Sequence, residues 1–113
     1  MHVEASMGWL MLGLAIATEV VGTLMLKATD GFTKLWPSVG VAIAYVVSFA
    51  LLGQALKSIG VGVAYAIWSG VGTVGIAIAA AVLFGERLTL PIMAGMALVI
   101  AGVVVMNISG SHS

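Results

Sequence analysis

Residues 61–84 read VGVAYAIWSGVGTVGIAIAAAVLF, a run of 24 residues that contains no charged side chain. An α-helix rises 1.5 Å per residue, so about 20 apolar residues cross a hydrocarbon core of roughly 30 Å. Three further stretches of similar length and composition occupy residues 7–26, 36–56 and 88–108. We therefore predict a single four-helix transmembrane domain over residues 1–113, with short loops between the helices.

The composition of the whole chain agrees with this interpretation. Of its 113 residues, 62% are hydrophobic and 7% are charged, whereas about 25% of the residues of a soluble domain are charged. Four acids balance four bases and no block of Lys or Arg occurs, so the basic surface that binds nucleic acid is missing. We expect an all-α integral membrane protein that contacts lipid and not nucleic acid.

The sequence also lacks the usual signatures of catalysis. There is no Cys, which excludes thiolate chemistry and Cys-based zinc sites. Neither a phosphate-cradling glycine loop nor a cluster of His and acidic residues at metal-ligand spacing is present. We expect no enzymatic activity, no bound metal and no cofactor.

The loop charges give little guidance on orientation in the membrane. If the helices alternate in direction, Lys27, Lys34 and Arg87 lie on one side and Lys57 on the other. An excess of basic residues marks the cytoplasmic side, and here that excess is small. Such a chain can insert either way, and two oppositely inserted copies can then pair as an antiparallel, dual-topology homodimer.

One charged residue lies inside a predicted span, and it is Glu19. An acid at this depth costs about 2.5 to 3.5 kcal/mol on insertion scales, and intramembrane acids are for this reason usually functional. No basic residue in any span can pair with it, and apolar surroundings disfavour its ionised form. We interpret Glu19 as a site for either a proton or a cationic substrate with an apolar body. The alternative is a neutral or paired carboxyl that only holds the helices together.

Small side chains surround this acid on its helix. Ala15, Gly22 and Thr23 lie about one turn from Glu19 on the same face. A face of small residues more often means close helix packing, but beside an unpaired carboxylate it predicts a cavity for a ligand.

Three aromatic residues lie away from the span ends, where interfacial anchoring would explain them. They are Tyr45, Tyr65 and Trp68, and Ser48 shares a stripe with Tyr45. Aromatic rings hold organic cations by cation–π attraction worth about 0.5 to 2 kcal/mol each; the alternative is that they fill gaps between helices. Four thin helices cannot enclose a ligand pocket of roughly 300 to 1,000 Å³, so we expect a homodimer.

The fourth span carries a pair of glycines on one face. Gly95 and Gly102 lie seven residues, or two helical turns, apart, and small residues let membrane helices approach closely. The pair marks either packing within the protomer or a dimer seam, and the spacing alone leaves both open.

Three segments resemble the small multidrug resistance (SMR) family of bacterial transporters: ATEVVGT at 17–23, GFTKLWPS at 31–38 and AYAIWSGVG at 64–72. The resemblance extends from about residue 8 to residue 108. It implies an antiparallel homodimer of four-helix protomers in the inner membrane. Such proteins are antiporters that exchange protons for cations by alternating access, driven by the proton gradient without a cofactor.

The resemblance also implies roles for individual residues. Glu19 would bind protons and substrate in turn, and Gly95 and Gly102 would form the dimer contact. Four residues would line the substrate chamber, namely Tyr45, Ser48, Tyr65 and Trp68. Gly70 and Gly72 would form a kink that bends the third helix.

The residue after Glu-Val-Val separates two branches of this family. Guanidinium exporters usually have Trp there, whereas this chain has Gly22, as exporters of quaternary ammonium and polyaromatic cations do. We therefore predict multidrug efflux of lipophilic cations, with Gly22 widening the chamber. The alternatives are a guanidinium-type exporter of small cations, a non-transporting accessory subunit of a heterodimer, and a proton-conducting subunit of a rotary machine, which would leave the aromatic residues unexplained.

Overall fold

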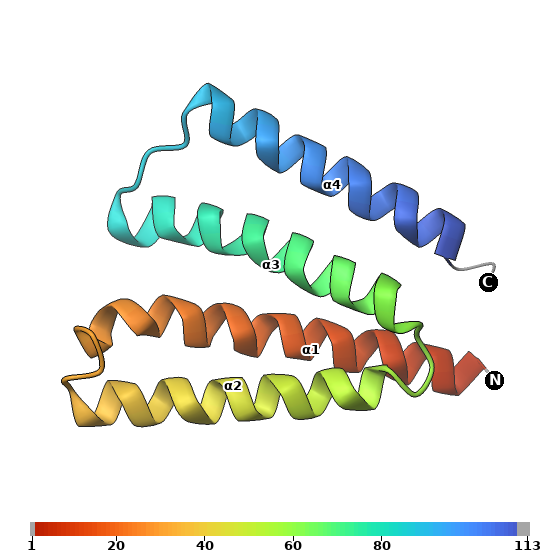
Figure 1. The fold of residues 1–113 in the computed structure, drawn as a ribbon, viewed down its shortest axis with the longest axis horizontal. Helices are drawn as coiled ribbons and strands as arrows, with labels where there is room; N and C mark the ends of the chain where they lie inside the picture. Colours follow the sequence, from red (N-terminus) through yellow and green to blue (C-terminus); the bar gives the residue numbers. More distant parts are fainter. Residues whose placement is uncertain (1, 111–113) are drawn as a thin grey trace.

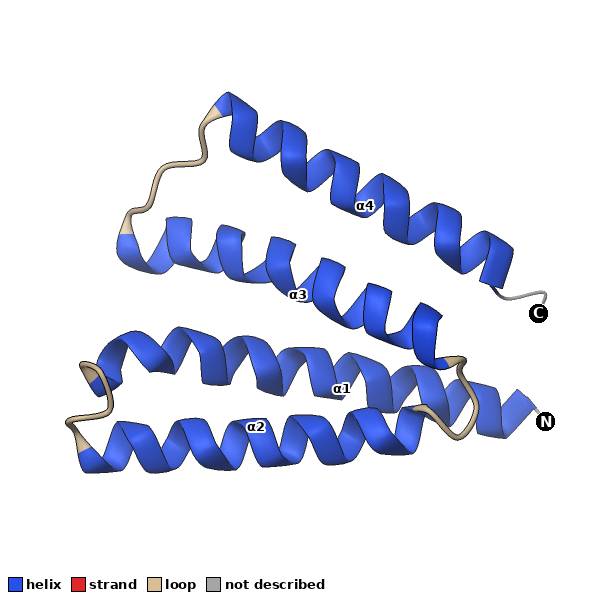
Figure 2. Cartoon of the chain, viewed as in Figure 1, coloured by secondary structure: helices blue, strands red, loops and turns tan. Residues whose placement is uncertain are grey.

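The structure is a computed structural model that describes residues 2–110, and within them it consists of helices joined by short connections (Figures 1 and 2). The long helices are α1 (His2–Leu26), α2 (Leu35–Ala55), α3 (Val61–Phe84) and α4 (Leu90–Gly110), and a short 3-10 helix, η1 (Lys27–Thr29), follows α1. All four long helices are long and apolar enough to cross a membrane, which confirms the predicted four-helix membrane architecture.

The four helices lie side by side in a flat layer, in the order α2, α1, α3, α4 (Figure 1). The layer measures 44 × 35 × 17 Å, and a single helix with its side chains is already about 10 to 12 Å thick. Both broad faces are therefore uncovered, and large apolar side chains such as Leu98 of α4 are mostly exposed. In a membrane, lipid or another protein covers these faces.

The most extensive helix contact of the protomer is the one between α1 and α2. Leu12 of α1 packs in a buried cluster with Ala55 at the end of α2, with Ile59 of the α2–α3 connection, and with Ala64 and Ile67 of α3. Lipid supplies no hydrophobic drive for helix association, so close packing and hydrogen bonds between helices hold such contacts together.

The connection between α3 and α4 follows ordinary capping chemistry. Gly85 ends α3 with a φ of +70°, a conformation that glycine adopts without steric cost. The next helix begins at Leu90, two residues later than the predicted start at 88, because Thr89 lies at its N-terminus. The Ile92 amide donates a hydrogen bond to the Thr89 hydroxyl at 3.4 Å, as is typical of an N-cap.

The glycines of α3 and α4 differ in their surroundings. A Cβ at Gly70 would lie 2.6 Å from Val103 Cγ2, so this glycine lets α4 approach α3. Within residues 2–110, no neighbouring atom lies within 4 Å of where a Cβ would be at Gly95 or Gly102. Packing within the protomer therefore does not explain these two glycines. The α3 helix runs without interruption through Gly70 and Gly72, and the kink remains a prediction.

Candidate functional site

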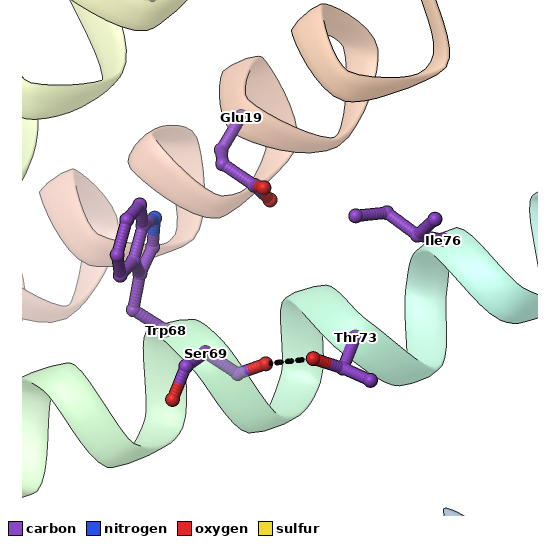
Figure 3. Close-up of a pocket in the computed structure, with 5 residues that line it drawn as sticks. All are labelled: Glu19, Trp68, Ser69, Thr73 and Ile76. Atoms are coloured by element: carbon purple, nitrogen blue, oxygen red, sulfur yellow. Dashed lines mark hydrogen bonds between the residues drawn. The ribbon is translucent and has the colours of Figure 1, made fainter.

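Glu19 lies in the second half of α1 and points toward α3 (Figure 3). Its side chain is partly buried. Among the residues that the structure describes, no basic group pairs with its carboxylate, and its two oxygens have different surroundings.

One oxygen is held by a chain of hydrogen bonds. The Thr23 hydroxyl donates to Glu19 Oε1 at 2.9 Å, and it lies 2.7 Å from the Tyr45 hydroxyl of α2. Thr23 has a single hydroxyl proton, so when that proton points at Glu19, Tyr45 must be the donor to Thr23. Two hydroxyls from two helices thus fix the orientation of the carboxylate.

The other oxygen, Oε2, is buried and has no hydrogen-bond partner among the residues that the structure describes. Buried polar groups are nearly always paired, and an exception calls for an explanation. A Cβ at Gly72 would lie 3.1 Å from this oxygen, so a glycine is what allows α3 to pass beside the carboxylate. The family resemblance assigned Gly72 to a kink, and its contact with Glu19 was not predicted.

A cavity of about 140 Å³ adjoins the carboxylate. It is lined by Glu19, Trp68, Ser69, Thr73 and Ile76 (Figure 3). The indole Nε1 of Trp68 is also buried without a hydrogen-bond partner, so residues that line the same cavity carry an unpaired acceptor and an unpaired donor. Both groups keep unused hydrogen-bonding capacity within the protomer.

The sequence prediction missed Ser69 and Thr73. Their spacing offered a signal, because residues 65, 69 and 73 recur every four positions and therefore share a helix face. Both side chains are exposed in the protomer, so the cavity reaches the protein surface.

Trp68 is held between two other rings. Its ring centroid lies 5.5 Å from that of Tyr65 and 5.4 Å from that of Phe49 of α2, with tilted planes in both pairs, the arrangement that aromatic pairs favour. Trp68 therefore presents an ordered wall to the cavity. Tyr65 is 58% exposed and supports Trp68 but does not itself line this cavity.

Three predicted chamber residues lie elsewhere in the protomer. The Ser48 hydroxyl donates to the Ala15 carbonyl at 2.6 Å, and both residues are fully buried between α1 and α2. A Cβ at Gly22 would lie 3.2 Å from the Tyr45 ring. Within the protomer, these small residues let α2 pack closely against α1, and their place in a substrate chamber remains a prediction. The cavity lies on the α3 side of Glu19.

Comparison with known proteins agrees with the predicted family. The family model described as Small Multidrug Resistance protein matches residues 7–99. The chain is 52% identical over 100 residues to the multidrug transporter EmrE of Escherichia coli K12, covering 88% of this chain and 91% of that protein. It is 50% identical over 106 residues to the quaternary ammonium compound-resistance protein QacE of Escherichia coli, covering 94% and 96%.

A third relative is a subunit of a pump. The chain is 47% identical over 104 residues to the nicotine metabolites export pump subunit NepA of Paenarthrobacter nicotinovorans, covering 92% of this chain and 90% of that protein. Together with the family match, these similarities show that the chain belongs to the small multidrug resistance family. It is a multi-pass protein of the inner membrane.

The contact between Gly72 and Glu19 is open to a direct test. In the Gly72→Ala variant the added methyl would lie 3.1 Å from Glu19 Oε2, closer than ordinary contact, so the carboxylate must move. We expect a changed ¹³C chemical shift for the Glu19 carboxyl carbon. The matched control is Gly75→Ala, whose Cβ would lie 3.7 Å from Val20 and leave the Glu19 signal in place. Equal shifts in both variants would contradict the assigned contact.

Proposed function

We propose that this protein exports lipophilic cations, quaternary ammonium and polyaromatic compounds among them, in exchange for protons, and that proton and cation compete for Glu19. The observation that carries the proposal is the state of Glu19 Oε2, which is buried, unpartnered and beside a cavity in a membrane-spanning helix. An intramembrane acid with no protein counter-charge must take its partner from outside the protein.

Competition follows from the hydrogen-bond geometry. Thr23 occupies Oε1, so the other oxygen offers one position that either a proton or a cation fills. The Trp68 ring beside it supplies cation–π attraction for an organic cation. A site that cannot hold a proton and a cation at once couples proton movement to cation export, provided that the helices rearrange only when the site is filled.

The names of the relatives support cation export. EmrE is named a multidrug transporter and QacE a quaternary ammonium compound-resistance protein, and both match this chain over nearly its full length. NepA is named a pump subunit, which is the one observation that favours an accessory role in a heterodimer. Transport by the purified chain alone distinguishes these two possibilities.

The active form that we propose is an antiparallel homodimer of oppositely inserted copies. A flat layer 17 Å thick cannot surround a substrate, and a cavity of about 140 Å³ is smaller than the roughly 300 to 1,000 Å³ of ligand pockets. A second copy over the face that carries Ser69 and Thr73 would enlarge and close the chamber. The uncovered glycines Gly95 and Gly102 of α4 suit a contact between protomers.

Energy would come from the proton gradient, without a cofactor. Tyr45 and Thr23 would orient the carboxylate, and Gly70 and Gly72 would allow α3 to bend as the site changes sides. The residues at the α1–α2 interface, Ala15, Ser48 and Gly22, would keep these two helices together during that change.

Replacing the acid tests the proposal. The Glu19→Gln protein, purified alone and placed in liposomes under an imposed pH gradient, should lose proton-driven tetraphenylphosphonium transport, because the amide can bind neither a proton nor a cation as the carboxylate does. The matched control is Glu86→Gln, which changes an exposed acid of the α3–α4 connection and should transport normally. Transport by Glu19→Gln at the wild-type rate would refute the role of Glu19.

Dual topology can be tested independently of transport. The chain has no Cys, so Asp30→Cys introduces a single thiol in the exposed α1–α2 turn. A membrane-impermeant maleimide applied from one side should label only part of the population, and permeabilisation should expose the rest. Complete labelling from one side alone would show a single orientation and contradict the antiparallel dimer.

A further inference from the structure

The last turns of α1 and α3 lie at the same end of the layer (Figure 1), and a groove of about 580 Å³ opens between them. Its lining comes from these two turns and from the short helix η1. The groove is large enough for a ligand or for part of one. Its apolar members are Val21, Leu24, Met25, Ala28, Leu83 and Phe84, and its charged member is Lys27.

The Lys27 ammonium is held against a wall of this groove. Its Nζ lies 4.4 Å from the centroid of the Phe84 ring, a cation–π contact that attracts the charge to the ring. Within residues 2–110, no acidic side chain pairs with this ammonium. The groove therefore carries a positive charge that has no counter-charge in the protomer.

The groove runs from the edge of the membrane into its hydrocarbon. Lys27 directly follows Leu26, the last residue of α1, and Phe84 is the last residue of α3. Val21 lies nearly two turns deeper in α1. Its side chain is 53% exposed, so the groove is open to the surroundings of the protein. A phospholipid has the same two parts in the same order, because its phosphate lies at the membrane surface and its acyl chains extend inward.

The charge of the groove selects among the possible occupants. A lipophilic cation, the proposed substrate, would be repelled by Lys27. A zwitterionic phospholipid brings a cationic group of its own beside the lysine, whereas an anionic phospholipid brings only negative charge. The connections at this end of the layer add to the preference, since they carry three bases against two acids, Asp30 and Glu86.

From this geometry we infer that the groove between the ends of α1 and α3 binds an anionic phospholipid, with its phosphate on the Lys27 ammonium and an acyl chain along the apolar wall. The groove shares no lining residue with the cavity beside Glu19. The lipid site is therefore a second site, and it does not depend on the proposed cation transport.

Competition between two lipids tests the inference in the full-length protein. The purified protein in detergent is mixed with equal amounts of phosphatidylglycerol and phosphatidylcholine that have identical acyl chains, and the bound lipids are counted by native mass spectrometry. Lys27→Gln removes the charge, and Lys27→Arg keeps it. The matched control is Lys34→Gln, which removes a base that lies at the same end of the layer but does not line the groove.

We expect the wild type to prefer phosphatidylglycerol, and Lys27→Gln to lower this preference about fivefold, the effect of one Lys near an anionic lipid surface. Lys27→Arg and Lys34→Gln should keep the wild-type preference. No preference in the wild type would overturn the inference. An equal loss in Lys27→Gln and Lys34→Gln would also overturn it, because the charge of the whole end, and not the groove, would then select the lipid.

The apolar wall is tested by Ala28→Phe, which places a ring in the groove and keeps Lys27. We expect weaker binding of both lipids, because the acyl chain loses its place. Unchanged binding, or displacement of phosphatidylglycerol by an equal concentration of inorganic phosphate, would show that the groove holds no acyl chain and would overturn the inference. Glu19→Gln should bind both lipids as the wild type does, which separates failure of the lipid site from failure of the proposed function.

Discussion

The burial of one carboxylate oxygen without a partner is the constraint on which the rest of this structure depends. Hydrocarbon disfavours an ionised acid, and the protein stabilises only one oxygen of the Glu19 carboxylate. Thr23 donates a hydrogen bond to Oε1, and Tyr45 in turn is hydrogen-bonded to Thr23. On the other side the protein leaves Oε2 beside a cavity. The orientation of the carboxylate is therefore fixed through Oε1, whereas Oε2 lacks a hydrogen-bond partner. This arrangement suits a site at which a proton or a cation from outside the protein binds to Oε2.

The helix packing serves this arrangement at two contacts. On the α2 side, Ala15, Gly22 and the hydroxyl of Ser48 bring α1 and α2 together, which places Tyr45 within reach of Thr23. On the α3 side, Gly72 lets the backbone pass the carboxylate without a side chain between them. Because the layer is flat, the cavity side remains accessible to lipid, to a substrate and to a second protomer.

The sequence predicted the four helices and Glu19 because both follow from charge and length along the chain. It could not predict which face of α1 meets α2 and which meets α3, since small residues are compatible with close packing and with a cavity alike. Ala15 and Gly22 were assigned to the chamber for this reason, and Ser48 because it shares a stripe with Tyr45 and matches a chamber position of the family. Within the protomer all three pack between α1 and α2.

The most direct test of the account is whether cation binding releases protons from Glu19. Calorimetric titration of the purified protein with tetraphenylphosphonium, in buffers that differ in ionisation enthalpy, reports proton release at each pH. The account predicts proton release and weaker apparent binding as the pH falls, with the release lost in Glu19→Gln. Binding of equal strength at every pH, with no proton released, would contradict competition at Glu19.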